Sequence, residues 1–221
     1  MKYYPVCIDV KNRNCLVVGG GSVGTRKIRT LVECGALITL ISLDISGFLA
    51  ELAGRGKIII KKRSYVSGDL EGMFLVIGAT NNEKLNMQIH ADADRLNILC
   101  NIADYPPGCS FILPSVVERG DLLIAISTSG KSPALAKKIR KELENRFGTE
   151  YAEFLILMGA IRKKLLRYKK GNEYYKPMFE KLVNSDLIEM IKNKKKDEAD
   201  LFLEKNFGKG FDLDSLLKDR D

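Results

Sequence analysis

The sequence predicts an α/β protein: a Rossmann-like doubly wound parallel sheet, then a small α+β region and a C-terminal all-helical region. Three observations lead to this fold class. Nearly continuous apolar runs alternate with helical patterns over residues 13–102, and such runs are typical of parallel strands buried on both faces. A glycine cluster separates the first apolar run from the first helix, as in dinucleotide-binding domains. After Thr149 the periodicity is only helical.

The first region contains five predicted strands, each a short apolar run bounded by polar residues or glycine. They are expected at residues 13–18, 36–42, 57–61, 73–79 and 97–102. Helices are expected at 22–34 and 83–96. Gly35 fits the left-handed position that ends the first helix, and the segment Thr80-Asn81-Asn82 is expected to cap the second. Strands and helices therefore alternate as in a doubly wound sheet.

The pattern changes after Asp104, where a Tyr-Pro-Pro-Gly segment predicts a turn. Two further strands are expected at 110–114 and 122–127, and a helix at 134–147. Ser132 is placed to cap that helix, with Pro133 at its first position. Later helices are expected at 151–170, 175–184, 186–195, 197–206 and 213–219. We expect three regions: a nucleotide-binding domain (1–113), a dimerisation region (114–148) and a C-terminal helical domain (149–221).

The bulk properties restrict the classes of protein that the sequence can represent. No apolar run approaches the roughly 20 residues that a membrane span needs, and the N-terminus lacks a signal-peptide pattern, so we expect a cytoplasmic protein with no membrane partner. The net charge is +8, with basic residues densest after Lys131. Solvated helix faces and a polyanionic ligand both explain this excess. Nucleic acid is not expected as a partner, because the basic residues are not interleaved with stacking aromatics.

The cysteines predict buried thiols rather than a metal or redox site. The chain has five cysteines and a single histidine, and no two cysteines form a CxxC pair. Cys7, Cys15 and Cys100 lie in or beside apolar runs, where burial is the usual fate of a thiol. No set of metal ligands is expected.

A G-x-G-x-x-G pattern gives the first indication of function. Gly19, Gly21 and Gly24 satisfy it, with Gly20 between the first two, and the pattern follows a predicted strand and opens a predicted helix. We expect Gly19 to allow the tight turn, Gly21 to let the backbone approach a pyrophosphate, and Gly24 to allow close packing of the helix. The helix N-terminus supplies N–H groups and partial positive charge for phosphate.

The ends of the second and fourth strands predict the adenosine half of the site. Asp44 lies about 20 residues after the glycine pattern, where an acidic residue contacts the ribose. No arginine is adjacent to it in the sequence, so NAD is expected in preference to NADP. Ala79 and Thr80, which follow the fourth strand, are expected to border the same half of the cleft.

Asp104 is the candidate catalytic residue. It follows the fifth predicted strand, and ligands of such sheets bind beyond the carboxyl ends of the strands. A carboxylate there can accept a proton as a hydride leaves the substrate. Position alone leaves open the alternative that Asp104 only caps the following turn.

Four segments together resemble a known family. In order they are GGGSVGTRKIRTLVECGALITLIS, GATNN, CNIADYPPGCSFILPS and LLIAISTSGKSPALAKKIRKELE. They resemble the dehydrogenase/ferrochelatase module of siroheme synthase, that is, the precorrin-2 dehydrogenase family. The segment AISTSGKSPALAKKIR is the most specific part, because generic Rossmann proteins do not carry it. The likeness runs from about Tyr4 to Phe147.

The resemblance implies a homodimer that oxidises precorrin-2 to sirohydrochlorin with NAD; some members also insert Fe²⁺ to give siroheme. It implies that Asp104 is the catalytic aspartate, and that Ser22, Val23, Leu43 and Asp44 contact NAD. Thr128 falls where some relatives carry a serine in the tetrapyrrole pocket. Lys131 and the N-terminus of the following helix suit an anionic ligand. The resemblance thus points to substrate binding by Thr128, Ser129, Gly130 and Lys131.

The alternative function is an NAD-sensing regulatory module without catalysis. Such a module shares the glycine pattern and the basic charge, but it does not need Asp104 or the STSGKSP segment. An ordinary small-molecule dehydrogenase is a weaker alternative, because it usually has a catalytic histidine, a Tyr-Lys pair or a metal. The only histidine here, His90, is poorly placed for that role.

Overall fold

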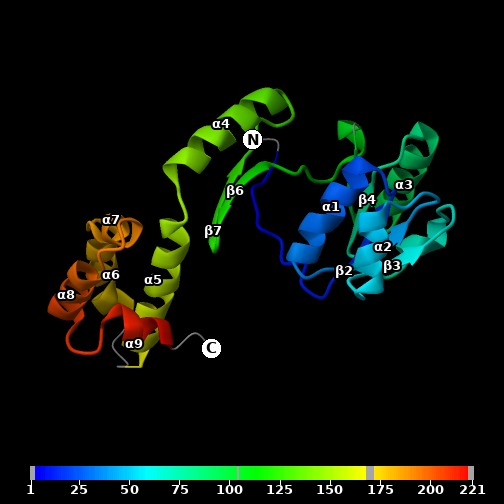
Figure 1. The fold of residues 1–221 in the computed structure, drawn as a ribbon. Coiled ribbons are helices and arrows are strands. Elements are labelled where there is room, and N and C mark those ends of the chain that lie inside the picture. Colours follow the sequence, from blue (N-terminus) through cyan, green and yellow to red (C-terminus); the bar gives the residue numbers. More distant parts are fainter. Residues whose placement is uncertain (1–2, 104, 168–171, 219–221) are drawn as a thin grey trace. The chain divides into compact units, whose positions relative to one another are not determined.

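The computed structural model describes residues 3–103, 105–167 and 172–218 (Figure 1). The chain divides into two compact units, Met1–Leu113 and Pro114–Asp221.

A sheet of five parallel strands forms the centre of the described part of the first unit (Figure 1). The strand order is β3-β2-β1-β4-β5, and each neighbouring pair is parallel. The chain thus builds outward from β1 in one direction and then resumes on its other side with β4, which confirms the predicted doubly wound parallel sheet. The strands are β1 (Asn14–Val18), β2 (Leu37–Ile41), β3 (Ile58–Lys61), β4 (Leu75–Gly78) and β5 (Leu99–Ile102).

The helices of this unit begin and end largely at the residues that the sequence indicates. They are α1 (Ser22–Glu33), α2 (Gly47–Gly54), α3 (Glu83–Arg95) and the 3-10 turns η1 (Ser67–Leu70) and η2 (Pro106–Gly108). Gly35 follows α1 with φ +74°, and the Asn82 side chain accepts a hydrogen bond from Leu85 N at the start of α3. Helix α2, capped by the hydroxyl of Ser46, was not predicted.

Alternate residues of the inner strands β2, β1 and β4 enter two hydrophobic clusters, one on each face of the sheet. Cys15 and Val17 of β1 pack with Ile28 of α1 and Leu49 of α2. The intervening Leu16 and Val18 pack in the other cluster, which also contains Ile89 and Ala93 of α3. Helices therefore cover both faces, and burial on both sides is the physical reason for the nearly unbroken apolar runs of the strands.

The five thiols differ in accessibility, and none forms a disulfide. Cys15 and Cys100 are buried in the sheet, as expected. Cys7 is exposed, so the prediction that it is buried was wrong. Its apolar neighbours do not form a strand: the N-terminal segment before β1 is irregular, and most of its side chains are exposed.

We predict that only exposed thiols react readily in the native protein. Burial raises the pKa of Cys15 to about 11 and that of Cys100 to about 12, so both are protonated at pH 8, whereas the thiolate is the reactive form. Alkylation at that pH followed by peptide mass mapping should label Cys7 and Cys34 and spare Cys15 and Cys100, and all should react after denaturation. Rapid native labelling of either buried thiol would contradict this packing.

The second unit begins with a two-stranded antiparallel hairpin, β6 (Ser115–Arg119) and β7 (Leu122–Ile126), followed by α4 (Pro133–Arg146). The strand predicted at 110–114 was wrong. Ser110 and Phe111 do run beside β5, but most of their hydrogen bonds to it use side chains: Ser110 Oγ accepts from Cys100 N and donates to the Cys100 carbonyl, and Asn101 Nδ2 donates to the Phe111 carbonyl. The strand begins beyond Pro114, and Gly120, with φ +58°, lies in the turn of the hairpin.

The remaining described helices enclose a core of their own. They are α5 (Glu150–Leu166), α6 (Asn172–Val183), α7 (Leu187–Lys192), α8 (Lys196–Phe207) and α9 (Leu213–Lys218). The core of this helical cluster consists of Phe154, Leu157, Ile161 and Leu165 of α5 with buried residues of the later helices, including Leu187 and Leu203. The predicted helix 151–170 extends into 168–171, which lies outside the described residues.

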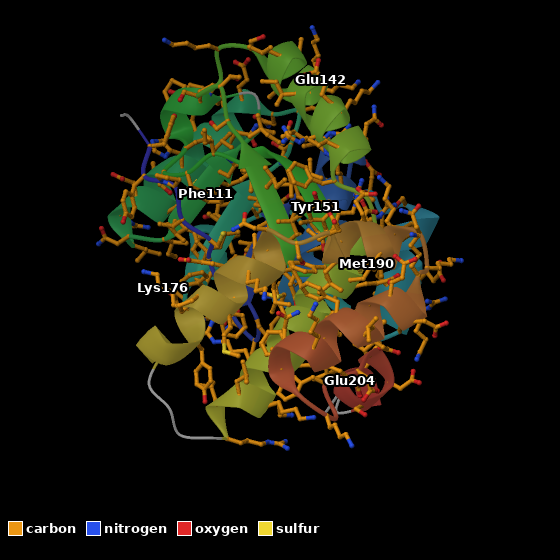
Figure 2. All side chains as sticks on the ribbon, turned by 90° about the vertical axis from the view of Figure 1, so that its left-hand side faces the viewer. Phe111, Glu142, Tyr151, Lys176, Met190 and Glu204 are labelled. Carbon is orange, nitrogen blue, oxygen red and sulfur yellow. The ribbon has the colours of Figure 1, made fainter. Side chains whose placement is uncertain are left out.

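Charged side chains cover the outer faces of these helices, as at Glu142 of α4 and Glu204 of α8 (Figure 2). Several lysines and arginines pair with an acid one turn away: Arg140 with Glu144 in α4, Lys196 with Asp200 in α8, and Lys195, which caps α8, with Glu198. Several of the basic residues therefore lie on solvated helix faces. No described helix is long and apolar enough to cross a membrane.

Candidate functional site

An open cleft of about 490 Å³ lies at the carboxyl ends of the parallel strands in the first unit. The loops after β1 and β4 meet there, at the point where the strand order reverses, which is where open α/β sheets bind their ligands. Seven predicted cofactor residues line the cleft: Gly19, Gly20, Gly21, Leu43, Asp44, Ala79 and Thr80. Ser22, Val23 and Gly24 form the adjacent first turn of α1.

The glycine turn is held by backbone geometry that a side chain would disrupt. Gly19 has φ +106°, and a Cβ atom on it would lie 2.3 Å from the Ala79 carbonyl oxygen. A Cβ atom on Gly24 would lie 2.0 Å from the Gly19 carbonyl oxygen. A Cβ atom on Gly21, in contrast, would meet nothing within 4 Å. The absence of a side chain at Gly21 thus opens space in the cleft, whereas at Gly19 and Gly24 it lets two pieces of chain touch.

The N-terminus of α1 is suited to an anion. Gly21 is its capping residue, no described side chain caps it, and its first turn contains no acidic residue. The leading N–H groups of a helix lack partners within the helix and carry partial positive charge. Together with the open space at Gly21, this end fits the pyrophosphate of a dinucleotide.

Ser42 links the glycine turn to the segment that carries Asp44, and the sequence analysis did not identify it. Its Oγ accepts a hydrogen bond from Gly20 N (3.0 Å) and donates one to the main-chain oxygen of Asp44 (2.7 Å). Leu43 and Asp44 are both exposed in the cleft. A hydroxyl directly after a buried strand is a weak signal in a sequence, because serine is also common at such positions for solubility alone.

The wall after β4 depends on a buried asparagine. Thr80 Oγ1 donates to Asn86 Oδ1 (2.7 Å), and Asn86 Nδ2 donates to the Thr80 carbonyl (3.0 Å). Asn86, from the first turns of α3, is only 6% exposed. This reciprocal pair fixes the backbone at Thr80, which borders the cleft as predicted.

The far wall of the cleft comes from the end of β3, which the sequence analysis did not connect with the site. Arg63, Ser64 and Tyr65 line the cleft together with Asp44. The prediction that no arginine adjoins Asp44 holds along the sequence only, because 19 positions separate the two residues. Pairing of β2 with β3 brings their ends together, and only the strand register reveals this.

A buried carboxylate holds Arg63. Asp69 of η1 accepts hydrogen bonds from Arg63 Nη1 (2.8 Å), Arg63 Nη2 (2.5 Å) and the backbone N–H of Val66 (3.0 Å). The Asp69 side chain is 4% exposed. Its pKa lies below the usual range, first because of the Arg63 guanidinium and against the opposing effect of burial.

Asp104, the predicted catalytic residue, lies outside the described residues. On its N-terminal side, β5 ends at Ile102, and Ala103 N donates to the Gly78 carbonyl at the end of β4. On its C-terminal side, Tyr105 precedes the turn η2. Asp104 therefore follows the carboxyl end of a strand, as the sequence predicts.

The predicted substrate residues belong to the second unit, in the loop between β7 and α4. Ser129 and Gly130 have φ +53° and φ +80°, and Ser129, Gly130 and Lys131 are exposed. Thr128 is half-buried, and its Oγ1 accepts a hydrogen bond from Ser132 N (3.2 Å). The Ser132 hydroxyl caps α4, as predicted, by accepting from Leu135 N. Within the described ranges, no group of three or more His, Cys, Asp or Glu is placed to hold a metal ion.

Two family models match the chain, in the order of its units. Residues 6–115 match a family described as "Putative NAD(P)-binding". Residues 119–146 match the family described as "Sirohaem biosynthesis protein central". The first match covers the sheet and its cleft, and the second covers β7 and α4.

Known proteins extend this likeness over most of the chain. It is 38% identical to a siroheme synthase of Vesicomyosocius okutanii over 90% of this chain and 43% of that protein. It is 33% identical to a siroheme synthase of Nitrosococcus oceani over 96% of this chain and 45% of that protein. The chain thus spans less than half the length of these relatives.

A solved structure matches at nearly full length. The structure of SirC, a precorrin-2 dehydrogenase, is similar with a TM-score of 0.72 and 28% sequence identity, over 83% of this chain and 91% of that one. From the two family models, the siroheme synthases and this structure, we conclude that the chain belongs to the protein family shared by siroheme synthases and the precorrin-2 dehydrogenase SirC.

Proposed function

We propose that this protein is an NAD-dependent dehydrogenase that oxidises precorrin-2 to sirohydrochlorin in siroheme biosynthesis. One observation carries the proposal: a cleft built for a dinucleotide, in a chain whose likeness to a precorrin-2 dehydrogenase covers 91% of that protein. The siroheme synthases are consistent with the same pathway.

We assign each part of the cofactor to residues of the cleft. The N-terminus of α1 and the open backbone at Gly21 would hold the pyrophosphate. Asp44 would accept hydrogen bonds from the adenosine ribose, while Leu43 and Thr80 would border the adenosine. When bound, NAD⁺ supplies the hydride acceptor at its nicotinamide ring.

Asp104 and the loop before α4 would serve the substrate. Oxidation of precorrin-2 removes a hydride and a proton, and we assign Asp104 to accept that proton or to orient the macrocycle. Exposed Lys131, beside the N-terminus of α4, would attract substrate carboxylates, with Thr128, Ser129 and Gly130 presenting hydroxyl and backbone groups. Insertion of Fe²⁺ into sirohydrochlorin is a further proposal, in which the macrocycle nitrogens hold the iron.

A direct assay tests the function. We expect the purified protein, supplied with precorrin-2 and NAD⁺, to produce NADH and sirohydrochlorin, both followed by absorbance. Binding of NAD⁺ without turnover would contradict the proposal and favour the NAD-sensing alternative. A separate reaction with sirohydrochlorin and Fe²⁺ tests iron insertion: formation of siroheme above the protein-free rate is expected, and an unchanged rate would exclude it.

We also propose that the protein is a homodimer and that β6 and β7 form part of the interface. One face of the hairpin packs on α4 and α5. The other presents the paired residues Val116 and Ala125, and Glu118 and Leu123. Leu123 is 49% exposed and Val116 is 36% exposed. Exposed apolar side chains that gather on one face are typical of an interaction surface, and a second copy would cover them. In this proposal 114–148 is the dimerisation region, and 149–221, with its separate core, the helical domain.

Replacing Leu123 with aspartate should dissociate the dimer. A charge in the interface core is strongly unfavourable, and we expect the dimer dissociation constant to rise by about 30-fold or more. Sedimentation velocity across a concentration series measures it. The matched control is Leu201→Asp, which changes a 70% exposed leucine on α8 and should leave the dimer intact. A monomeric wild type, or equal effects of both changes, would refute this interface.

A further inference from the structure

The cleft contains a cation that a cofactor with a 2′-phosphate would use. Arg63 lines the cleft together with Asp44, the residue assigned to the adenosine ribose. NADP differs from NAD by a phosphate at that ribose, and an arginine near the ribose is the usual partner of this phosphate. The cleft therefore contains both an acidic residue that suits the ribose of NAD and an arginine that suits the 2′-phosphate of NADP.

The guanidinium of Arg63 is already engaged within the protein. Nη1 and Nη2 both donate to the Asp69 carboxylate, and Nη1 also donates to the Ser64 carbonyl (2.9 Å). A two-pronged pair of this kind has both strength and a fixed direction. Because the Asp69 side chain is 4% exposed, losing its cationic partner would leave a buried charge poorly compensated.

A second carboxylate fixes the same wall. The Tyr65 hydroxyl donates to Asp92 Oδ2 of α3 (3.0 Å), and Tyr65 is 6% exposed. The segment that carries Arg63 is therefore tied at two points, to η1 and to α3. Lys61, at the end of β3, adds another cation 3.6 Å from Asp69, but it does not line the cleft.

We propose that Asp69 is a specificity-determining positioning residue, which holds Arg63 away from the ribose and so keeps the cleft selective for a cofactor without a 2′-phosphate. This inference rests on the proposed function only in that the cleft binds a nicotinamide dinucleotide. In the native cleft, Asp44 repels a 2′-phosphate and Arg63 is not available to attract it. Removing the charge of Asp69 frees the guanidinium.

The test compares affinities for NAD⁺ and NADP⁺, measured by titration calorimetry on the full chain. The wild type should bind NAD⁺ more tightly. In Asp69→Asn, which retains an acceptor for the Val66 N–H, NADP⁺ affinity should rise relative to NAD⁺ affinity by about tenfold, the size of one charge-assisted contact. A folded variant with an unchanged ratio would overturn the inference while leaving the proposed function intact. A wild type that binds neither cofactor would overturn both.

Two double variants identify the cation responsible. Asp69→Asn with Arg63→Gln should lose the gain for NADP⁺, whereas Asp69→Asn with Lys61→Gln should keep it, because only Arg63 lines the cleft. The reverse pattern would overturn the assignment to Arg63. If Asp69 had only a structural role, every variant that lacks it would bind both cofactors more weakly and by the same factor.

An independent variant decides the matter if Asp69→Asn does not fold. Asp44→Ser removes an exposed carboxylate from the cleft and leaves the Arg63–Asp69 pair in place. We expect weaker NAD⁺ binding and no preference for NADP⁺. A clear preference for NADP⁺ in Asp44→Ser would show that Arg63 is available despite Asp69, and would overturn the proposal.

Discussion

Gly24→Ala should reduce NAD⁺ affinity by about a hundredfold, which corresponds to ~2.7 kcal/mol. The added Cβ atom would lie 2.0 Å from the Gly19 carbonyl oxygen, so α1 or the glycine turn must move. Because the contact is with backbone rather than with a flexible side chain, the strain falls on the phosphate-binding geometry itself. Titration calorimetry measures the affinity, and thermal unfolding should show a lower Tm.

Variants of two other glycines distinguish distortion of the glycine turn from filling of the space in front of α1. Gly21→Ala should keep the wild-type Tm, since its Cβ atom meets nothing within 4 Å. It should still lower the affinity for NAD⁺, because the added methyl group fills the space in front of the α1 N-terminus. Gly54→Ala, at the end of α2 and also in open space, should leave NAD⁺ affinity unchanged and should not lower the Tm, because alanine favours a helix more than glycine does. Wild-type affinity in Gly24→Ala would mean that the dinucleotide does not bind at this turn.

Asp104→Ala should lower kcat for precorrin-2 oxidation by about 10²–10⁴-fold, the usual contribution of a positioned acid or base. NAD⁺ affinity should stay unchanged, because Asp104 is not assigned to the cofactor. Steady-state kinetics and calorimetry test the two statements separately. Asp197→Ala, which removes an exposed carboxylate from α8, is the matched control and should retain full activity.

Asp104→Asn distinguishes the two roles that the proposal allows. Asparagine can still orient the macrocycle by hydrogen bonding, but it cannot accept the proton. A loss as deep as in Asp104→Ala would favour proton transfer, and substantial activity would favour orientation. Normal turnover in both variants would reduce Asp104 to a residue that caps the turn after β5.

The parallel sheet could be predicted because its inner strands are buried on both faces, which leaves a nearly unbroken apolar run in each. Helix α2 could not, because it is short, starts and ends with glycine, and is fixed mainly by burial of Leu49 under the sheet. The strand predicted at 110–114 failed for a related reason. Of its apolar residues, Phe111 packs against the core, whereas Leu113 is 46% exposed, so the run is not a buried strand.

Site residues could be predicted where their position directly after a strand marks them. They could not be predicted where their role depends on a neighbour from another strand. Gly19, Asp44 and Thr80 each follow a strand whose end the sequence marks. Arg63 also follows a strand, but its importance depends on lying next to Asp44, and the register of β2 against β3 decides that. Asn86 is likewise polar in sequence and buried in the structure, because its partner is the backbone of Thr80.

The hydrogen bond of Ser42 has a consequence for how cofactor preference can change during evolution. Ser42 reaches the main-chain oxygen of Asp44 and not its carboxylate. Any amino acid at position 44 offers that same oxygen, so the side chain that we propose contacts the ribose can be exchanged while the glycine turn keeps its support. Substitutions at position 44 can therefore change the cofactor preference without removing the support of the glycine turn. A protein with a new nucleotide preference can then evolve without an intermediate that has lost dinucleotide binding.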